Sequence, residues 1–368
     1  MNKNKEIEIL RAVGILFVIA SHLNVYITWS PKWLLLLYSN TYFWGGVDLF
    51  FCISGFVITK SIMRLFTERE SSKYWSEVFS FWVRRFYRLV PAALFFIFIK
   101  IVISIFIPGT KYFGNFAPNL IDFVLQVFHM SNFRYYYCVK AMSECGANPI
   151  YWSLSLEEQF YIVFPIAIFL LRERVSYLLI LIILIQFPLE REMFSMGWVV
   201  RSDAISWGCL IALLSTSDLY RIMKPKLMNN GLFRSVVIFL MLIALSIFAR
   251  GVVVPFYIGA MAVPCAVLVW LASYDEGLIF RSVKNNKVML WIGSRSYSIY
   301  LTHSLAYSII YHVLVTVNGS VDAKDTFRIL CIGTVLTIVF SEFSYKVIEK
   351  PIRDRGRAIS KEISSRSV

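Results

Sequence analysis

Long apolar runs separated by short polar segments organise the whole chain. A membrane-spanning helix needs about 20 mainly apolar residues, and the runs predict about ten such spans. They lie at 7–29, 42–63, 86–107, 150–171, 175–189, 197–215, 234–250, 253–273, 288–315 and 327–348. The run Leu120–Met130 is shorter than a crossing, so we expect a re-entrant or surface helix there; if it spans, the count rises to about eleven. The predicted fold is all-α, a polytopic transmembrane helix bundle.

Composition and charge support the membrane prediction and set its orientation. The chain is 58% hydrophobic and 16% charged, and its net charge is +14. Of the 37 Lys and Arg residues, 25 fall in predicted cytoplasmic segments and 7 in predicted outer loops. This asymmetry follows the positive-inside rule. The net positive charge therefore indicates how the chain is oriented in the membrane, and its distribution argues against nucleic-acid binding. We expect both termini in the cytoplasm.

The domain organisation follows from the same pattern. Residues 1–350 are predicted to form a single transmembrane domain, and 351–368 a basic cytoplasmic tail with a frayed end. The first run is too long for a cleavable signal peptide and contains Arg11, so we expect it to stay in the mature protein.

Two ionisable residues stand out within the first apolar run. Arg11 and His22 are eleven residues apart, which places them on one helical face about 16 Å apart along the axis. Ionisable groups at membrane depth are costly and persist mainly where they face a protein interior or a wet cavity. His22 is therefore a candidate catalytic base, although a buried interhelical hydrogen bond explains an isolated membrane histidine equally well.

A pair of carboxylates at the entry to the fourth span favours the catalytic interpretation of His22 over the structural one. Glu157 and Glu158 enter from the outer side and His22 from the inner side, and the three reach similar depths. A carboxylate beside an imidazole can orient it and stabilise its protonated form. We therefore expect Glu157 or Glu158 to support His22.

Other polar residues in or near the spans are weaker candidates for a functional site. Arg85 and Arg88 lie on one helical face at the cytoplasmic entrance to the third span, where they suit either lipid anchoring or a phosphate clamp. The second span carries Asp48 near its outer end and the small residue Ser54, which by itself indicates only close helix packing. Tyr300 and His303 share a face of the ninth span.

Cysteine usage offers one candidate disulfide. Cys138 and Cys145 lie close together in the long outer loop, where an oxidising compartment permits a bridge, and the open alternative is two free thiols. No Cys and His spacing resembles a metal site, so we expect no bound metal.

The motifs together resemble the acyltransferase-3 family of bacterial integral-membrane O-acyltransferases. The resemblance rests on six pieces in the family's order: Arg11 with His22; Gly46-Val47-Asp48-Leu49-Phe50-Phe51 with Ser54-Gly55-Phe56; Arg85-x-x-Arg88-x-x-Pro91; Trp152-Ser153-Leu154 with Glu157-Glu158-Gln159-Phe160-Tyr161; Ser296-Tyr297-x-x-Tyr300-Leu301-x-His303; and Glu349-Lys350-Pro351. Each piece alone is weak, and the ordered set is specific. The residues after His303 depart from the family's pattern, which leaves its role open.

The resemblance implies transfer of an acyl group, usually acetyl, from cytosolic acetyl-CoA to a hydroxyl of a surface polysaccharide precursor such as a lipopolysaccharide O-antigen. It also implies a multi-pass protein of the bacterial inner membrane and no permanently bound cofactor. By analogy His22 is catalytic, and Arg11, Arg85 and Arg88 bind acyl-CoA. The expected substrate pocket consists of Asp48, Ser54, Trp152, Ser153, Tyr300 and His303.

Several alternatives stay open from the sequence. His22 can act as general base on the acceptor hydroxyl or carry the acyl group as an acyl-imidazole. A transporter or flippase of a lipid-linked glycan also needs intramembrane charges and broken helices, and a small molecule is an alternative acceptor. The acyl chain length, the modified hydroxyl and the oligomeric state are not encoded in these motifs.

Overall fold

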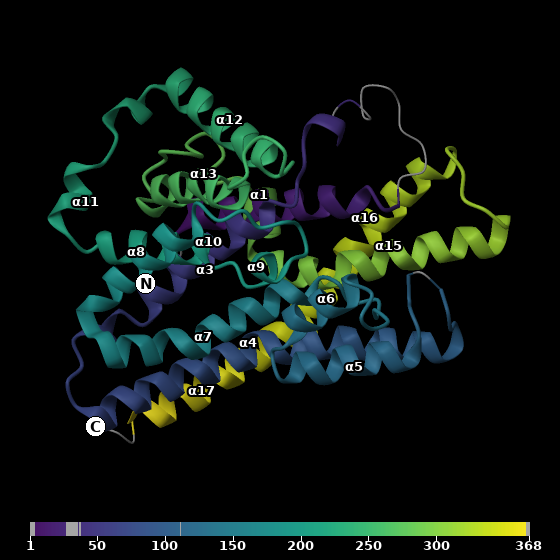
Figure 1. Ribbon diagram of the computed structural model, residues 1–368, viewed down its shortest axis with the longest axis horizontal. Coiled ribbons are helices and arrows are strands. Elements are labelled where there is room, and N and C mark those ends of the chain that lie inside the picture. Colours follow the sequence, from purple (N-terminus) through teal and green to yellow (C-terminus); the bar gives the residue numbers. More distant parts are fainter. Residues whose placement is uncertain (1–3, 27–35, 37, 111, 366–368) are drawn as a thin grey trace.

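A computed structural model describes residues 4–26, 36, 38–110 and 112–365. Every named element of this described part is a helix, which confirms the predicted all-α class (Figure 1). In chain order the helices are α1 Lys5–Leu23, α3 Gly46–Ser61, η1 Met63–Phe66, α4 Ser71–Phe106, α5 Phe116–Val127, α6 Ser131–Val139, α7 Tyr151–Leu171, η2 Arg172–Arg174, α8 Val175–Gln186, α9 Met196–Val199, α10 Asp203–Leu214, α11 Asp218–Ile222, η3 Lys226–Asn229, α12 Gly231–Phe248, α13 Tyr257–Ser273, α14 Lys287–Ser294, α15 Ser296–Asn318, α16 Asp325–Phe343, the π-helix η4 Ser344–Glu349 and α17 Lys350–Ser365.

Several of these helices have the length and composition of membrane spans. Within the described residues 5 helical segments are long and apolar enough to cross a bilayer: Ser71–Phe106, Met196–Leu214, Gly231–Phe248, Ser296–Asn318 and Asp325–Ser365. Helix α8 has 12 residues, which is about 18 Å of helix and shorter than a full crossing. The number of spans and the cytoplasmic placement of the termini stay predictions, and residues 27–29 of the first predicted span lie outside the described residues.

The centre of the bundle is held by close contact between α3 and α10. A Cβ atom at Gly55 would stand 2.1 Å from the carbonyl oxygen of Ile205, and one at Gly208 would stand 1.9 Å from the carbonyl oxygen of Cys52. Only glycine lets the two backbones approach this closely, as expected for small residues at helix interfaces within membranes. This contact fixes α3, which carries Asp48 and Ser54, against the second half of the chain.

Helices α5 and α6 form a hairpin in which α6 packs on α7 and α5 runs along α4 (Figure 1). The tip of the hairpin is His129, which has φ 56° and reaches Glu158, about two helical turns below the start of α7. The hairpin tip thus lies beside α7, and the re-entrant or surface position of Leu120–Met130 in a membrane stays a prediction.

The C-terminal segment packs on the bundle. Helix α17 runs along the first half of α4 (Figure 1), where the hydroxyl of Ser80 donates to the backbone oxygen of Ser360 at 2.6 Å. A Cβ at Gly356 would stand 2.4 Å from Cβ of Tyr87. The expectation of a frayed tail after Pro351 is therefore wrong for the described residues up to 365, because an amphipathic basic helix finds a complementary face on α4.

Candidate active site

His22 and His303 form a pair at the meeting of α1 and α15. Their rings are stacked, with centroids 5.0 Å apart, and His22 Nδ1 lies 2.7 Å from His303 Nε2. His303 is 1% exposed, whereas His22 is half-buried at the edge of a cavity. The residue predicted from sequence as the catalytic base therefore has a second histidine as its partner.

The hydrogen bonds of this pair assign the protons when both rings are neutral. His303 Nδ1 lies 3.1 Å from the carbonyl oxygen of Ile299, one turn earlier on α15. A carbonyl only accepts, so His303 Nδ1 carries the proton and His303 Nε2 carries a lone pair. His22 Nδ1 must then donate to that lone pair, which leaves the lone pair of His22 at Nε2. The backbone of α15 thus sets the tautomer of His22 through His303.

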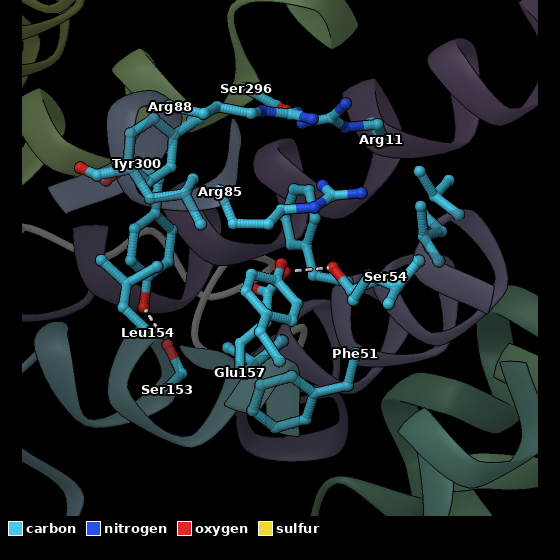
Figure 2. A pocket seen from close by; sticks show the side chains of 18 residues that line it. Arg11, Phe51, Ser54, Arg85, Arg88, Ser153, Leu154, Glu157, Ser296 and Tyr300 are labelled. Atoms are coloured by element: carbon cyan, nitrogen blue, oxygen red, sulfur yellow. Dashed lines mark hydrogen bonds between the residues drawn. The ribbon is translucent and has the colours of Figure 1, made fainter. Parts of the chain in front are cut away.

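A first cavity, the arginine cavity, lies between α1, α3, α4, α7 and α15 and has a volume of about 80 Å³. Figure 2 shows the side chains of Arg11, Arg85 and Arg88 gathered on one side of it, with Glu157 and Ser54 facing them. The three arginines come from two helices far apart in sequence. The fold therefore brings together all three residues predicted to bind acyl-CoA.

The arginines of this cavity retain capacity for a ligand. The Nε atom of Arg88 is buried and has no hydrogen-bond partner. Arg85 donates to Ser61 Oγ at 3.2 Å and lies over the rings of Phe81 and Tyr161. A buried donor without a partner is costly. Phosphate oxygens, which guanidinium groups bind with forked hydrogen bonds, are suitable acceptors for it.

Glu157 belongs to the arginine cavity and not to the histidine pair. Its Oε1 accepts hydrogen bonds from the hydroxyls of Ser54 and Tyr161 (Figure 2). Ser153 and Tyr300 line the same cavity, with their hydroxyl oxygens 2.7 Å apart. Four residues assigned to the site from sequence therefore line one cavity.

Glu158 points the other way, toward the tip of the α5–α6 hairpin. Its Oε2 accepts from Gln126 Nε2 at 2.9 Å and lies 2.8 Å from His129 Nδ1. The expectation that Glu157 or Glu158 supports His22 is not met by this geometry, since both carboxylates have other partners and His303 occupies that position. Adjacent residues on a helix point about 100° apart, so the two carboxylates face different neighbours.

Asp48 and Trp152 lie outside both cavities, contrary to their assignment to the substrate pocket. Asp48 accepts two hydrogen bonds from Arg201, from Nε at 2.8 Å and from Nη2 at 2.9 Å. The guanidinium of Arg201 packs against two neighbouring indole rings, 4.7 Å from the ring of Trp152 and 4.2 Å from that of Trp198. A buried ion pair enclosed by aromatic rings is a structural element of the bundle.

A second cavity, the lysine cavity, has a volume of about 300 Å³ and lies on the other side of the histidine pair. It is lined by His22, by Lys100 of α4, by Asp122 and Arg134 of the hairpin, and by the segment 145–150, which includes Asn148. The predicted Cys138–Cys145 disulfide is present and forms part of the wall, with an S–S distance of 1.92 Å.

The histidine pair and Tyr300 separate the two cavities. Tyr300 lines the arginine cavity, and its ring lies 5.9 Å from that of His303. His303 holds His22, which lines the lysine cavity. The arginine cavity thus reaches Tyr300 beside His303, and the lysine cavity reaches His22.

Sequence reasoning missed Lys100, Asp122, Arg134 and Arg201. Lys100 and Arg201 are charged residues inside predicted spans, so the rule that drew attention to Arg11 and His22 applies to them equally. Asp122 and Arg134 lie in the segment predicted to be outside the membrane spans, where charged residues are ordinary. Their pairing, at 3.1 Å between Asp122 Oδ1 and Arg134 Nε, follows only from the hairpin.

Comparison with known proteins identifies the family to which this chain belongs. A family model described as an acyltransferase domain matches residues 4–343. O-acetyltransferase OatA from Staphylococcus aureus strain NCTC 8325 / PS 47 is 28% identical over 94% of this chain, and so is OatA from strain COL. The chain spans 57% of the length of these relatives. No solved structure matches the chain.

Proposed function

We propose, from the premise that this chain belongs to the acyltransferase-3 family, that it is a multi-pass O-acyltransferase of the bacterial inner membrane. It moves an acyl group, acetyl in the first instance, from cytosolic acyl-CoA to a hydroxyl of a surface polysaccharide precursor such as a lipopolysaccharide O-antigen. The observation that carries the proposal is the His22–His303 pair, in which His22 lines the lysine cavity and His303 lies next to Tyr300 of the arginine cavity.

The arginine cavity supports the donor side of this reaction. Arg11, Arg85 and Arg88 offer three positive charges on the side that the charge pattern predicts to be cytoplasmic. The phosphates of acyl-CoA bind there, and the narrow pantetheine arm extends toward Tyr300 and His22. Arg11 and His22 are about 16 Å apart along α1, which is the length that the arm has to span.

The lone pair on His22 Nε2 supports the chemistry. As a general base it takes the proton of the acceptor hydroxyl while the hydroxyl oxygen attacks the thioester carbonyl. The C–S bond then breaks, and the proton returns from His22 to the sulfur, which gives an ester and free CoA. His303 is a positioning residue in this step, because its lone pair keeps the His22 Nδ1–H bond as the imidazole becomes positively charged.

The same lone pair supports a covalent route in which His22 first takes the acyl group and then passes it to the acceptor. Initial-rate kinetics separate the two routes. Parallel lines in double-reciprocal plots, together with acyl-CoA hydrolysis without acceptor, indicate the covalent route, whereas intersecting lines indicate direct transfer.

Mass spectrometry of the host's surface polysaccharide tests the proposal. A deletion strain is restored with wild-type protein, with His22→Ala, or with His312→Ala as a matched control, since His312 lines neither cavity. We expect an acetyl-sized mass on the polysaccharide with wild type and His312→Ala, and its loss with His22→Ala at equal protein levels.

Unchanged acylation with His22→Ala would refute the role of His22. If the polysaccharide is unacylated in every strain but the purified protein hydrolyses acyl-CoA, the acceptor is a small molecule and not the polysaccharide. Absence of both acylation and hydrolysis would favour the transporter alternative.

A further inference from the structure

Lys100 is a buried cation whose hydrogen bonds leave one donor free. It is 3% exposed, and its Nζ donates to the carbonyl oxygen of Ala147 and, at 3.1 Å, to Ser304 Oγ. An ammonium group has three N–H donors, so one remains directed at the lysine cavity, which Lys100 lines. Among the described residues, no carboxylate oxygen forms an ion pair with Lys100 within 4.0 Å.

The other charged groups on the cavity wall are already paired. Asp122 accepts from Arg134 Nε at 3.1 Å and from Asn148 Nδ2 at 3.1 Å. The two Nη atoms of Arg134 donate to Ser143 Oγ and to the carbonyl oxygen of Glu144. With His22 neutral, the charges of Lys100, Arg134 and Asp122 leave the wall with one net positive charge, located at Lys100.

The same wall carries an unpaired acceptor. Asn148 is buried, and its Nδ2 is engaged with Asn119 and Asp122, yet its Oδ1 has no hydrogen-bond partner. A buried acceptor of this kind is costly unless a ligand or water donates to it. A cationic donor and a neutral acceptor, each without a complete set of partners, therefore belong to the cavity that His22 also lines.

We propose that the lysine cavity binds an acceptor sugar that carries one negative charge close to the hydroxyl that is acylated. The anion pairs with Lys100, and a hydroxyl of the same sugar donates to Asn148 Oδ1. A buried charge needs an oppositely charged partner or hydrogen bonds. An anionic ligand supplies Lys100 with both a counter-charge and a hydrogen-bond acceptor. This inference rests on the proposed function, because it treats the cavity as the acceptor site of that reaction.

Binding of simple glycosides to the purified full-length protein in nanodiscs tests the inference. The probes share one ring and differ in one group: methyl glucoside, methyl glucuronoside with a carboxylate, and methyl glucoside 6-phosphate. Titration calorimetry gives the Kd of each. We expect an anionic probe to bind roughly 10- to 100-fold more tightly than the neutral one, the range for one charge-assisted hydrogen bond. Whichever of the two anionic probes binds more tightly indicates whether the charged group of the acceptor is a carboxylate or a phosphate.

Two variants assign the effect to Lys100. Lys100→Gln removes the charge and should abolish the preference for the anionic probe. Lys140→Gln makes the same change on an exposed residue just after α6, which does not line the cavity, and should preserve the preference. The comparison of probes on wild type needs no variant, so it remains decisive even if Lys100→Gln does not fold.

Three outcomes would overturn the inference: equal affinity of wild type for charged and neutral probes, a preference that survives in folded Lys100→Gln, or no binding of any probe at its highest soluble concentration. A protein that binds the anionic probe through Lys100 but consumes no acyl-CoA would overturn the proposed function and leave the anion site in place.

Discussion

The hydrogen bond between the two histidines yields the sharpest prediction. In His303→Ala the Nδ1–H of His22 loses its acceptor, which lies at 2.7 Å in the wild type. The imidazole is then free to exchange its proton between Nδ1 and Nε2 and to rotate. Both changes reduce the fraction of molecules with a correctly aimed lone pair at Nε2.

The expected magnitude follows from the bond itself. A buried hydrogen bond contributes about 0.5–1.5 kcal/mol, and an unpaired buried donor costs about 1–3 kcal/mol. Each 1.36 kcal/mol is about tenfold in rate. We therefore expect kcat for acetyl transfer to fall about 10- to 100-fold. KM for acetyl-CoA should change less than about threefold, because the arginine cavity is intact.

The conservative variant His303→Gln separates positioning from packing. Its amide oxygen can accept from His22 Nδ1–H, so we expect it to recover at least about tenfold of the activity lost in His303→Ala. The assay is acetyl transfer by the purified protein in nanodiscs, with thermal unfolding as the control for folding. Full activity of folded His303→Ala would refute the reasoning, and so would a Gln variant that is folded but no more active than Ala.

Three further predictions concern other parts of the molecule. Arg88→Gln should raise KM for acetyl-CoA about 10- to 100-fold with little change in kcat. Arg355→Gln, at an exposed position of α17, should leave KM unchanged, and a loss confined to kcat in Arg88→Gln would contradict a binding role. Asp48→Asn should lower the free energy of unfolding by about 3–5 kcal/mol, because it leaves a buried guanidinium without its carboxylate, and urea titration in detergent checks this. Replacing Cys138 and Cys145 by serine should lower stability by about 2 kcal/mol and make it insensitive to reductant; equal stability of wild type with and without reductant would contradict this.

Periodic and local features of the chain were predictable from the sequence. Apolar runs predicted the all-α class because a helix is the regular structure that satisfies its own backbone hydrogen bonds in lipid. Residues that share one helix were placed well, since helical spacing alone puts Arg11 below His22 and Arg85 beside Arg88. The candidate disulfide was identified for the same reason, because its cysteines are only seven residues apart.

Partners from different helices required the tertiary structure. Glu157 and Glu158 were expected beside His22 because their depths match, but depth does not specify the direction in which a side chain points. Rotation of α7 turns Glu157 to Ser54 and Glu158 to His129.

The sequence by itself thus determined which residues are polar at membrane depth and in what order they follow one another. Hydrophobic burial and helix periodicity act locally along the chain, which is why this much is encoded in the pattern. The tertiary structure decided that His303 holds His22, that Arg201 takes up Asp48, and that Lys100 faces a cavity. Those contacts depend on how each helix is rotated about its axis, and that rotation is set by close packing such as the Gly55–Gly208 contact.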